Sequence, residues 1–269
     1  MENEHYVIRG GIEGRERLRI LARVMGGVTR AFLDRLSLRE GMQILDVGCG
    51  GGDATLELAA RVGPSGRVVG VDIDAVKLEI ARAEARERGL AHVEFRECDA
   101  ATAAGEGAFD VVYARFLLTH LGEPEEAVAA FHRAVRPGGL VAVEDIDTRG
   151  HFHHPESRSL DRYYELYDEV ARRRGGDPHI GARLPTLLRA AGFVDVEVAV
   201  AHPAGLRGDV KLMAPVTLEN VAPALVSAGL ATRDEIDGLV GDLFAIAYDD
   251  RTFASIPRVV QSWGRKHAS

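Results

Sequence analysis

The sequence predicts an α/β fold in which helices cover both faces of a doubly wound, mostly parallel sheet of seven strands. Short apolar runs alternate with helical segments through the first 150 residues, which is typical of such sheets. The first apolar run, residues 44–47, leads into the glycine cluster of residues 48–52 and then into a helical segment. That order predicts a buried strand, a tight turn and a helix N-terminus that can approach a ligand closely.

Residues 1–40 precede the first strand and are expected to form two helices. Leu18, Leu21 and Met25 mark one face of the first, and Phe32 and Leu36 mark the second. Amphipathic helices usually serve packing, so both could simply cover the sheet edge. The alternative is a helical lid over a ligand at the carboxyl edge of the sheet.

Residues 41–147 are expected to form the ligand-binding core. After the glycine loop, strands are predicted at residues 67–72, 93–99, 109–114 and 140–144, in each case from a short apolar run bounded by turn residues. Helices are predicted at residues 54–60, around residues 80–88, and at residues 117–121 and 125–135.

The second half is expected to build the other side of the pocket. Residues 148–203 contain Tyr163, Tyr164 and Tyr167 at helical spacing, which predicts core or pocket wall, and a sixth strand at 194–200. Residues 204–250 are too long for a hairpin connection, so we expect a helical cap insertion with helices at 218–228 and 234–247. The last strand is predicted in residues 251–269, at 253–263. No repeat or linker divides the chain, so one domain over residues 1–269 is expected.

Composition narrows the class of protein. The chain has 269 residues, a net charge of −8 and 46% hydrophobic residues, which is ordinary for a soluble globular protein and disfavours a general nucleic-acid binder. Its two cysteines, Cys49 and Cys98, suggest neither a disulfide framework nor a zinc module. No apolar run reaches membrane-spanning length and no signal-peptide pattern is present, so we expect a cytoplasmic protein without nucleic-acid or membrane partners. A homodimer is left open.

Charged side chains follow several of the predicted strands. Ligands of doubly wound sheets bind at the carboxyl ends of the strands, where Asp72, Asp99, Arg115 and Glu144 would share one rim. Asp72 could accept both ribose hydroxyls of an adenine nucleoside, or it could cap a helix, which Asp74 could do instead. Asp99 could accept the adenine amino group, or it could be an ordinary turn residue.

The glycine spacing distinguishes between two kinds of cofactor. A dinucleotide fingerprint requires a third glycine three residues after the second, but Asp53 stands there, after Gly48 and Gly50. An acidic residue at a helix N-terminus opposes a pyrophosphate, and Asp46 adds a second negative charge. The loop therefore favours a cofactor with a cationic centre.

These motifs resemble those of the class I S-adenosylmethionine-dependent methyltransferases, especially small-molecule enzymes of ubiquinone and menaquinone biosynthesis and of natural products. The resemblance rests on the segments ILDVGCGGGDATLELA, GRVVGVDID, CDA, FDVVYARFLLTHL and VRPGGLVAVED, within residues 40–147, and on FASIPRVVQSWGRK near the C-terminus. It implies a Rossmann-like methyltransferase fold, S-adenosylmethionine as cofactor and S-adenosylhomocysteine as product.

The resemblance also implies roles for single residues. Gly48 and Gly50 would let the cofactor's amino-acid moiety approach, and Asp72 would hold the ribose. The remaining expected contacts are Ile73 and Lys77 beside the adenine, Asp99 with Ala100 at its edge, Arg115 near the methionine portion and Tyr6 closing over the cofactor.

Three residues are candidates for a general base: His120, Asp145 and His151. His120 could equally be a packed or capping histidine. The run His151–His154 close to several carboxylates raises a metal hypothesis, but its spacing matches no standard motif, so no metal is expected.

The expected activity is transfer of a methyl group to an oxygen, carbon or nitrogen atom of a small, apolar acceptor such as a secondary metabolite or a quinone-like compound. Such an enzyme holds donor and acceptor in reactive geometry and supplies a base where the acceptor needs one. Two alternatives are a cofactor-binding regulator or repurposed scaffold without transferase activity, and an NAD-dependent oxidoreductase.

Overall fold

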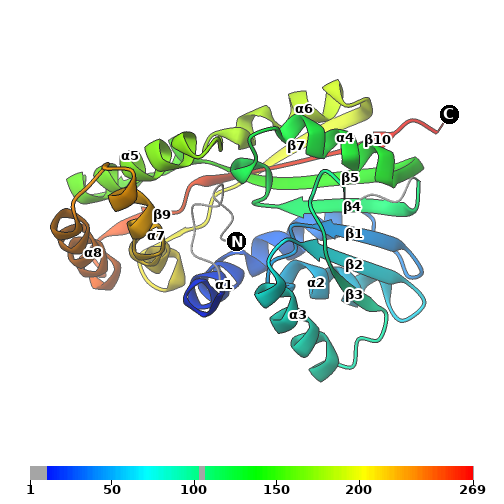
Figure 1. Cartoon of the computed structure of the whole chain (residues 1–269), viewed down its shortest axis with the longest axis horizontal. Coiled ribbons are helices and arrows are strands. Elements are labelled where there is room, and N and C mark those ends of the chain that lie inside the picture. The colour runs from blue at the N-terminus through cyan, green and yellow to red at the C-terminus, as the bar shows by residue number, and fades with distance from the viewer. Residues whose placement is uncertain (1–10, 103–106, 269) are drawn as a thin grey trace.

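A seven-stranded sheet with helices on both faces forms the centre of the molecule (Figure 1). The computed structural model describes residues 11–102 and 107–268; for residues 11–16 it gives the backbone alone. Its strands are β1 Gln43–Val47, β2 Arg67–Asp72, β3 Val93–Glu97, β4 Phe109–Arg115, β5 Val135–Asp147, β6 His153–His154, β7 Phe193–Ala201, β8 Ala204–Gly205, β9 Phe253–Ser255 and β10 Arg258–Lys266. Its α-helices are α1 Gly11–Arg35, α2 Asp53–Val62, α3 Ala75–Glu87, α4 Pro124–Ala134, α5 Arg158–Arg173, α6 Leu184–Ala190, α7 Asp209–Ser227 and α8 Arg233–Tyr248.

The large sheet has the strand order β3-β2-β1-β4-β5-β10-β7, and this confirms the predicted fold class. The first five strands pair in parallel, and β10 runs antiparallel between β5 and β7. Strands β1, β2 and β4 are buried along nearly their whole length because helices cover both faces, so they read as continuous apolar runs. Their carboxyl ends lie side by side at one edge of the sheet.

Helix α1 is continuous, whereas the sequence predicted two helices in this region. Its buried positions, among them Ile20, Met25, Thr29 and Phe32, recur every three to five residues and so form one face. Gly26 and Gly27 lie within the helix and do not interrupt it, because packing of this face outweighs their low helix propensity.

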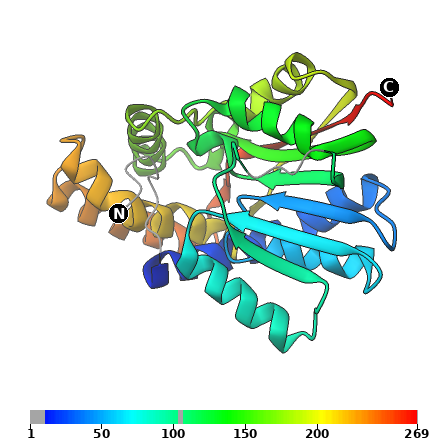
Figure 2. The ribbon, with the colours of Figure 1, turned by 45° about the vertical axis from the view of Figure 1, so that its right-hand side comes forward.

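The segment predicted as an insertion forms helices α7 and α8, which extend away from the sheet together with one end of α5 (Figures 1 and 2). Helix α7 begins at Asp209, nine residues earlier than predicted, although it contains Pro215 and Pro223. Buried side chains of α5, α7 and α8 form a hydrophobic cluster of their own, which includes Leu160, Leu218 and Leu243.

Several predicted elements have different bounds in the structure. The predicted last strand is two strands, because β9 turns away to pair with β6 and β8 in a separate three-stranded sheet. The predicted helix at 117–121 is a single 3-10 turn, η1 Leu118–His120, and two further turns are η2 Thr148–Gly150 and η3 Ile180–Arg183. Strand β5 begins at Val135 rather than at residue 140, since the Pro-Gly-Gly sequence continues the strand with a shift in register.

None of the described helices is long and apolar enough to span a membrane.

Candidate active site

A cavity lies at the carboxyl edge of the parallel strands and continues between helices α1, α5, α7 and α8. It has two compartments. The sheet-edge compartment is lined by the glycine loop and by the ends of β2 and β4, with Asp46, Gly48, Cys49, Gly50, Gly51, Asp53, Asp72, Lys77, Arg115, Thr119 and His120. The helix compartment is lined mainly by apolar and aromatic side chains: Leu18, Leu21, Ile146, Leu160, Tyr163, Tyr164, Tyr167, Val210, Met213, Ala214, Leu243, Ile246, Ala254 and Ile256.

The glycine loop places backbone directly against the sheet-edge compartment. Gly48 and Gly50 have φ angles of +72° and +53°, in the left-handed region that favours glycine. A Cβ added to Gly48 would lie 2.9 Å from Leu117 Cδ1, so this glycine also permits packing behind the loop. Gly50 lines the cavity, and a Cβ added to it would meet no protein atom within 4 Å. The space over Gly50 is therefore open to a ligand.

Asp72 ends β2 and fixes the shape of the loop. Its Oδ2 accepts a hydrogen bond from Gly50 N at 2.9 Å and its Oδ1 accepts one from Asp74 N at 2.9 Å. The alternative role, helix capping, belongs to Asp74, whose side chain accepts from the backbone N–H groups of Val76 and Lys77. Each carboxylate oxygen of Asp72 accepts one of these bonds and keeps capacity for a second, so the side chain can also accept ribose hydroxyls.

Negative charge gathers beneath the loop. Asp46 is 1% exposed, and its Oδ2 accepts a hydrogen bond from Thr55 Oγ1 at 2.6 Å. Burial raises the pKa of Asp46 to about 7; the Thr55 hydroxyl and Arg115 oppose this shift, and Asp53 and Asp72 add to it. A cationic ligand centre would relieve the repulsion among these carboxylates.

Arg115 joins three elements at this edge. Its guanidinium pairs with the Asp53 carboxylate at the start of α2, and it donates to Thr29 Oγ1 of α1 at 2.9 Å. The side chain is 10% exposed and lines the cavity, as the sequence predicted for a residue near the cofactor.

The other predicted cofactor contacts divide into two groups. Lys77 lines the cavity, whereas Ile73, Asp99 and Ala100 lie outside its lining. Ile73 is 47% exposed, and Asp99 accepts a backbone hydrogen bond from Ala101 N at 2.8 Å in a turn. Their contacts with an adenine ring stay predictions. Tyr6 lies outside the described residues.

Of the three predicted bases, the structure brings only His120 to the cavity. Burial lowers the pKa of His120 to about 3, and the positive charges of Arg17 and Lys77 lower it further. The ring is therefore neutral at physiological pH and a weak proton acceptor.

Asp145 does not reach the cavity, contrary to the expectation for a catalytic base. Its fully buried carboxylate accepts backbone hydrogen bonds from Thr119 N at 3.1 Å and Ile146 N at 2.8 Å. Burial raises its pKa to about 7, and these hydrogen bonds oppose the shift. Its contacts are those of a residue that anchors the turn η1 to β5.

His151 lies behind the cavity wall rather than in it. Its Nδ1 bonds the Thr148 carbonyl oxygen at 2.6 Å, and its ring stacks on Tyr164 with 3.7 Å between centroids. Tyr164 and Thr148 line the cavity, so His151 contacts two lining residues without lining the cavity itself.

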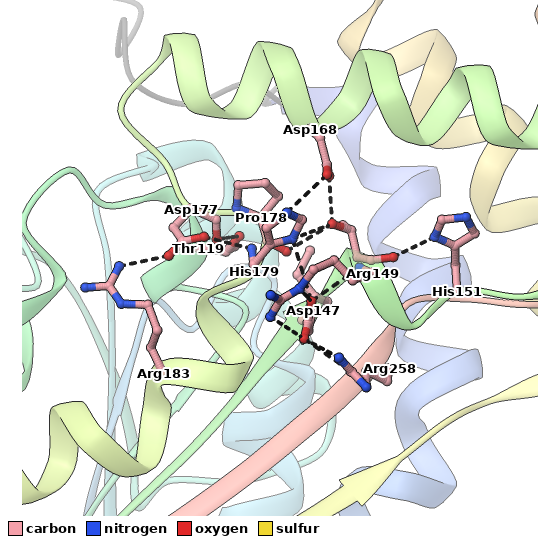
Figure 3. Close-up of polar contacts among 12 residues, drawn as sticks. Thr119, Asp147, Arg149, His151, Asp168, Asp177, Pro178, His179, Arg183 and Arg258 are labelled. Carbon is pink, nitrogen blue, oxygen red and sulfur yellow. Dashed lines mark hydrogen bonds and ion pairs between the residues drawn. The ribbon is translucent and has the colours of Figure 1, made fainter.

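A polar network around Asp147 lies next to the cavity (Figure 3). Asp147, fully buried at the end of β5, accepts from Arg149 Nε at 2.8 Å and Arg258 Nη2 at 2.7 Å. Burial raises the pKa of Asp147, but the two guanidinium groups outweigh it and leave the pKa below its usual value. Thr148, which lines the cavity, donates to Asp168 of α5 at 2.7 Å. The network thus joins α5 to the end of the sheet.

Two charged residues of the cavity lining, Arg17 and Lys211, were not predicted from the sequence. Arg17 of α1 donates from its Nε to Thr217 Oγ1 of α7 at 3.0 Å, and Lys211 of α7 donates from its Nζ to the Asp249 carbonyl oxygen at 2.7 Å. An arginine in an arginine-rich helix carries no sequence signal of this placement, because the placement depends on how α1 packs against α7.

Comparison with known proteins identifies the family. A family model described as a methyltransferase domain matches residues 38–192, more than half of the chain. A nocamycin O-methyltransferase of Saccharothrix syringae is 40% identical over 117 residues, covering 43% of this chain and 42% of that protein. A ubiquinone/menaquinone biosynthesis C-methyltransferase of Idiomarina loihiensis is 31% identical over 140 residues, 51% of this chain and 53% of that protein.

A solved structure resembles the fold over a longer range. The [4+2]-cyclase SpnF superimposes with a TM-score of 0.56 and 23% identity over 90% of this chain and 81% of that one. The likeness shows the fold, which proteins of different activity share. The matched regions span about half the length of the curated relatives. The chain belongs to the methyltransferase-domain family, which confirms the resemblance seen in the sequence.

Proposed function

We propose that this protein is an S-adenosylmethionine-dependent methyltransferase that acts on a small, largely apolar acceptor. The observation that carries the proposal is the single cavity that joins a glycine-loop compartment at the sheet edge to an aromatic and apolar compartment between helices. A donor in the first compartment and an acceptor in the second would lie in the same continuous cavity.

The residues of the first compartment fit the cofactor. The open space over Gly50 suits close approach of the amino-acid moiety, Asp72 can accept ribose hydroxyls, and the carboxylates of Asp46 and Asp53 favour a cationic sulfur. When bound, the cofactor supplies a methyl group on a positively charged sulfonium. The chain itself orients donor and acceptor and excludes water, which accounts for much of the rate of such a displacement.

The second compartment suggests the chemistry of the acceptor. Of the three predicted bases only His120 lines the cavity, and it is a weak proton acceptor; burial raises the pKa of Tyr163 to about 12. An acceptor would therefore lose its proton through its own acidity. Arg17, which lines the cavity beside Thr217, can stabilise the resulting anion. We propose an acidic hydroxyl or a carboxylic acid on an apolar body.

A labelled-methyl transfer assay tests the proposal. Apolar phenols, enols and carboxylic acids would be compared with apolar alcohols and neutral amines of similar size, with release of S-adenosylhomocysteine as the second readout. We expect turnover of the acids alone, and Arg17→Gln should raise KM for them while the affinity for S-adenosylhomocysteine stays unchanged.

Three outcomes would contradict the proposal. Binding of S-adenosylhomocysteine without transfer to any acceptor would favour the scaffold alternative. Stabilisation by NAD but not by S-adenosylhomocysteine would favour an oxidoreductase. Equal turnover of neutral amines and acids would remove Arg17 from acceptor selection.

A further inference from the structure

Two histidines and one aspartate gather outside the cavity, at the contact between β6 and the start of α5. They are His151, His153 and Asp161, and one ligand atom of each lies within 4.8 Å of the others. In the sequence, these histidines lie close to the carboxylates of β5. Asp161, which the fold brings to them from α5, supplies a third ligand that the spacing could not reveal.

The two histidines are presented on the same side of a fixed backbone. Their rings are nearly parallel, at 5°, with 6.3 Å between centroids. The segment that carries them, from the end of η2 into β6, is held by pairing of His153 with Ala254 and by the hydrogen bond from Phe152 N to Ser255 Oγ at 2.9 Å. Asp161 lies in the first turn of α5, whose N-cap is Ser157. The ligand atoms are thus carried by ordered elements, as a metal site requires.

The hydrogen bond of the His151 ring leaves Nε2 free to bind a metal. Its Nδ1 lies 2.6 Å from the Thr148 carbonyl oxygen, which can only accept (Figure 3). Nδ1 must therefore carry the proton, and Nε2 of the neutral ring carries a lone pair. Metal-binding histidines commonly donate their other ring N–H to a backbone carbonyl in this way.

His153 directs one ring nitrogen at Asp161. Its side chain is only 10% exposed, and its buried Nδ1 has no hydrogen-bond partner among the described residues, so no bond at Nδ1 prevents Nε2 from carrying the lone pair. Its Nε2 lies 3.6 Å from Asp161 Oδ1, too far for a hydrogen bond. Ligand atoms around a tetrahedral zinc ion are about 3.4 Å apart, given metal–ligand bonds of about 2.1 Å. Asp161 is 56% exposed, so an ion could enter from solvent.

We propose that His151, His153 and Asp161 bind one zinc ion, with water completing its coordination. Two imidazoles and one carboxylate suit zinc, whereas magnesium and calcium prefer oxygen ligands. Because His151 stacks on Tyr164, the ion joins β6 to α5 behind the acceptor wall and orders that wall without touching the acceptor. The site is structural and does not depend on the proposed methyl transfer.

Zinc binding is tested on the untagged full chain after removal of metals with a chelator. We expect one equivalent of zinc by calorimetry and metal analysis, and a Co²⁺ complex with the visible absorption of a four-coordinate site. His153→Gln and Asp161→Asn should each weaken zinc binding at least about tenfold. Because Asp161 is exposed, its substitution should leave folding unchanged. His154→Asn is the matched control, because this neighbouring histidine is exposed and is not part of the cluster, and it should bind zinc as the wild type does.

Thermal unfolding provides the second readout. Zinc should raise the Tm of the wild type and of His154→Asn, but not that of His153→Gln or Asp161→Asn. Magnesium should leave all four unchanged. The proposal is overturned if the wild type binds no zinc, if the cluster variants bind it as tightly as the wild type, or if His154→Asn loses it. Measuring S-adenosylhomocysteine affinity on the same zinc-free samples separates this result from the proposed function.

Discussion

Asp46 couples the ionisation of the protein to the charge of its ligand. In the ligand-free protein burial raises its pKa to about 7, and a cation bound nearby would lower that pKa. Binding of the cationic cofactor then releases a proton, so its affinity should rise with pH below about pH 7, by at most about tenfold per pH unit, and level off above it. Calorimetry across this range should show a steeper rise for S-adenosylmethionine than for S-adenosylhomocysteine, which lacks the sulfonium charge. Asp46→Asn should remove the difference; an equal slope for both ligands in the wild type would contradict the coupling.

The same shift affects stability in the opposite direction. A carboxyl group whose pKa is raised on folding stabilises the folded state below its unfolded pKa, and this contribution is lost as pH rises through the folded pKa. Asp46 and Asp145 both have pKa values raised to about 7 by burial. Their combined contribution to the free energy of unfolding of the ligand-free protein should therefore fall between about pH 4 and pH 7.

Gly52 tests how much of the glycine loop is needed for folding rather than for binding. Its φ angle is +85°, and an added Cβ would lie 2.9 Å from Ala81 Cβ and 3.1 Å from Phe95 Cζ. Gly52→Ala should therefore cost about 2–4 kcal/mol, from backbone strain and overpacking together. Gly89→Ala is the control, since Gly89 has φ +68° but no atom within 4 Å of an added Cβ, and it should cost about 1–2 kcal/mol. Denaturant unfolding measures both; equal losses would show that packing at Gly52 is unimportant.

At this scale the sequence located several residues that line the sheet-edge compartment and few that line the helix compartment. Gly48, Gly50 and Asp72 could be found because their spacing along one strand–turn–helix unit is local. Arg17 and Asp161 could not, because their partners come from helices or strands distant in sequence, and only packing brings them together.

Helix α1 is connected to the sheet edge by the hydrogen bond from Arg115 to Thr29. Thr29→Val keeps the volume but removes the acceptor, so Arg115 loses a buried partner at a cost of about 1 kcal/mol. If α1 closes over the sheet-edge compartment, S-adenosylhomocysteine should dissociate several-fold faster from this variant in stopped-flow measurements. Thr29→Ser should dissociate it at the wild-type rate, and an unchanged rate in Thr29→Val would show that α1 does not gate the compartment.

The elements that the sequence misjudged are those with weak local signals. Strands β6, β8 and β9 have two or three residues each, too few for alternation to be read, and they exist because they pair with one another. Helix α1 was expected to be two helices, yet its buried face continues through Gly26 and Gly27. In both cases tertiary packing decides what local preference leaves open.

The whole molecule contains at least two apolar clusters that can respond separately to mutation. One lies between the sheet and helices α1 and α2 and includes Leu58, and the other joins α5, α7 and α8 and includes Leu218; both leucines are fully buried. Leu218→Ala should cost about 2–4 kcal/mol and lower hydrogen-exchange protection mainly in α5, α7 and α8. Leu58→Ala should lower protection throughout the sheet and weaken S-adenosylhomocysteine binding. A uniform loss of protection in Leu218→Ala would mean that the two clusters unfold as one unit.

Parallel pairing was largely predictable because three of the four parallel pairs, β1–β2, β2–β3 and β4–β5, are consecutive strands joined by a helix. The position of the helix pair α7–α8 was not predictable, because the local sequence of an insertion does not determine where it packs.

Strand β10 has a consequence for how the protein is made. It occupies the position between β5 and β7, yet it is synthesised after both and after the two helices of the insertion. Until Val259 to Ser262 leave the ribosome, β5 has an open edge and β7 lacks its sheet partner. A nascent chain therefore exposes an unpaired, apolar strand edge through much of the second half of its synthesis, the kind of edge that chaperones protect from aggregation.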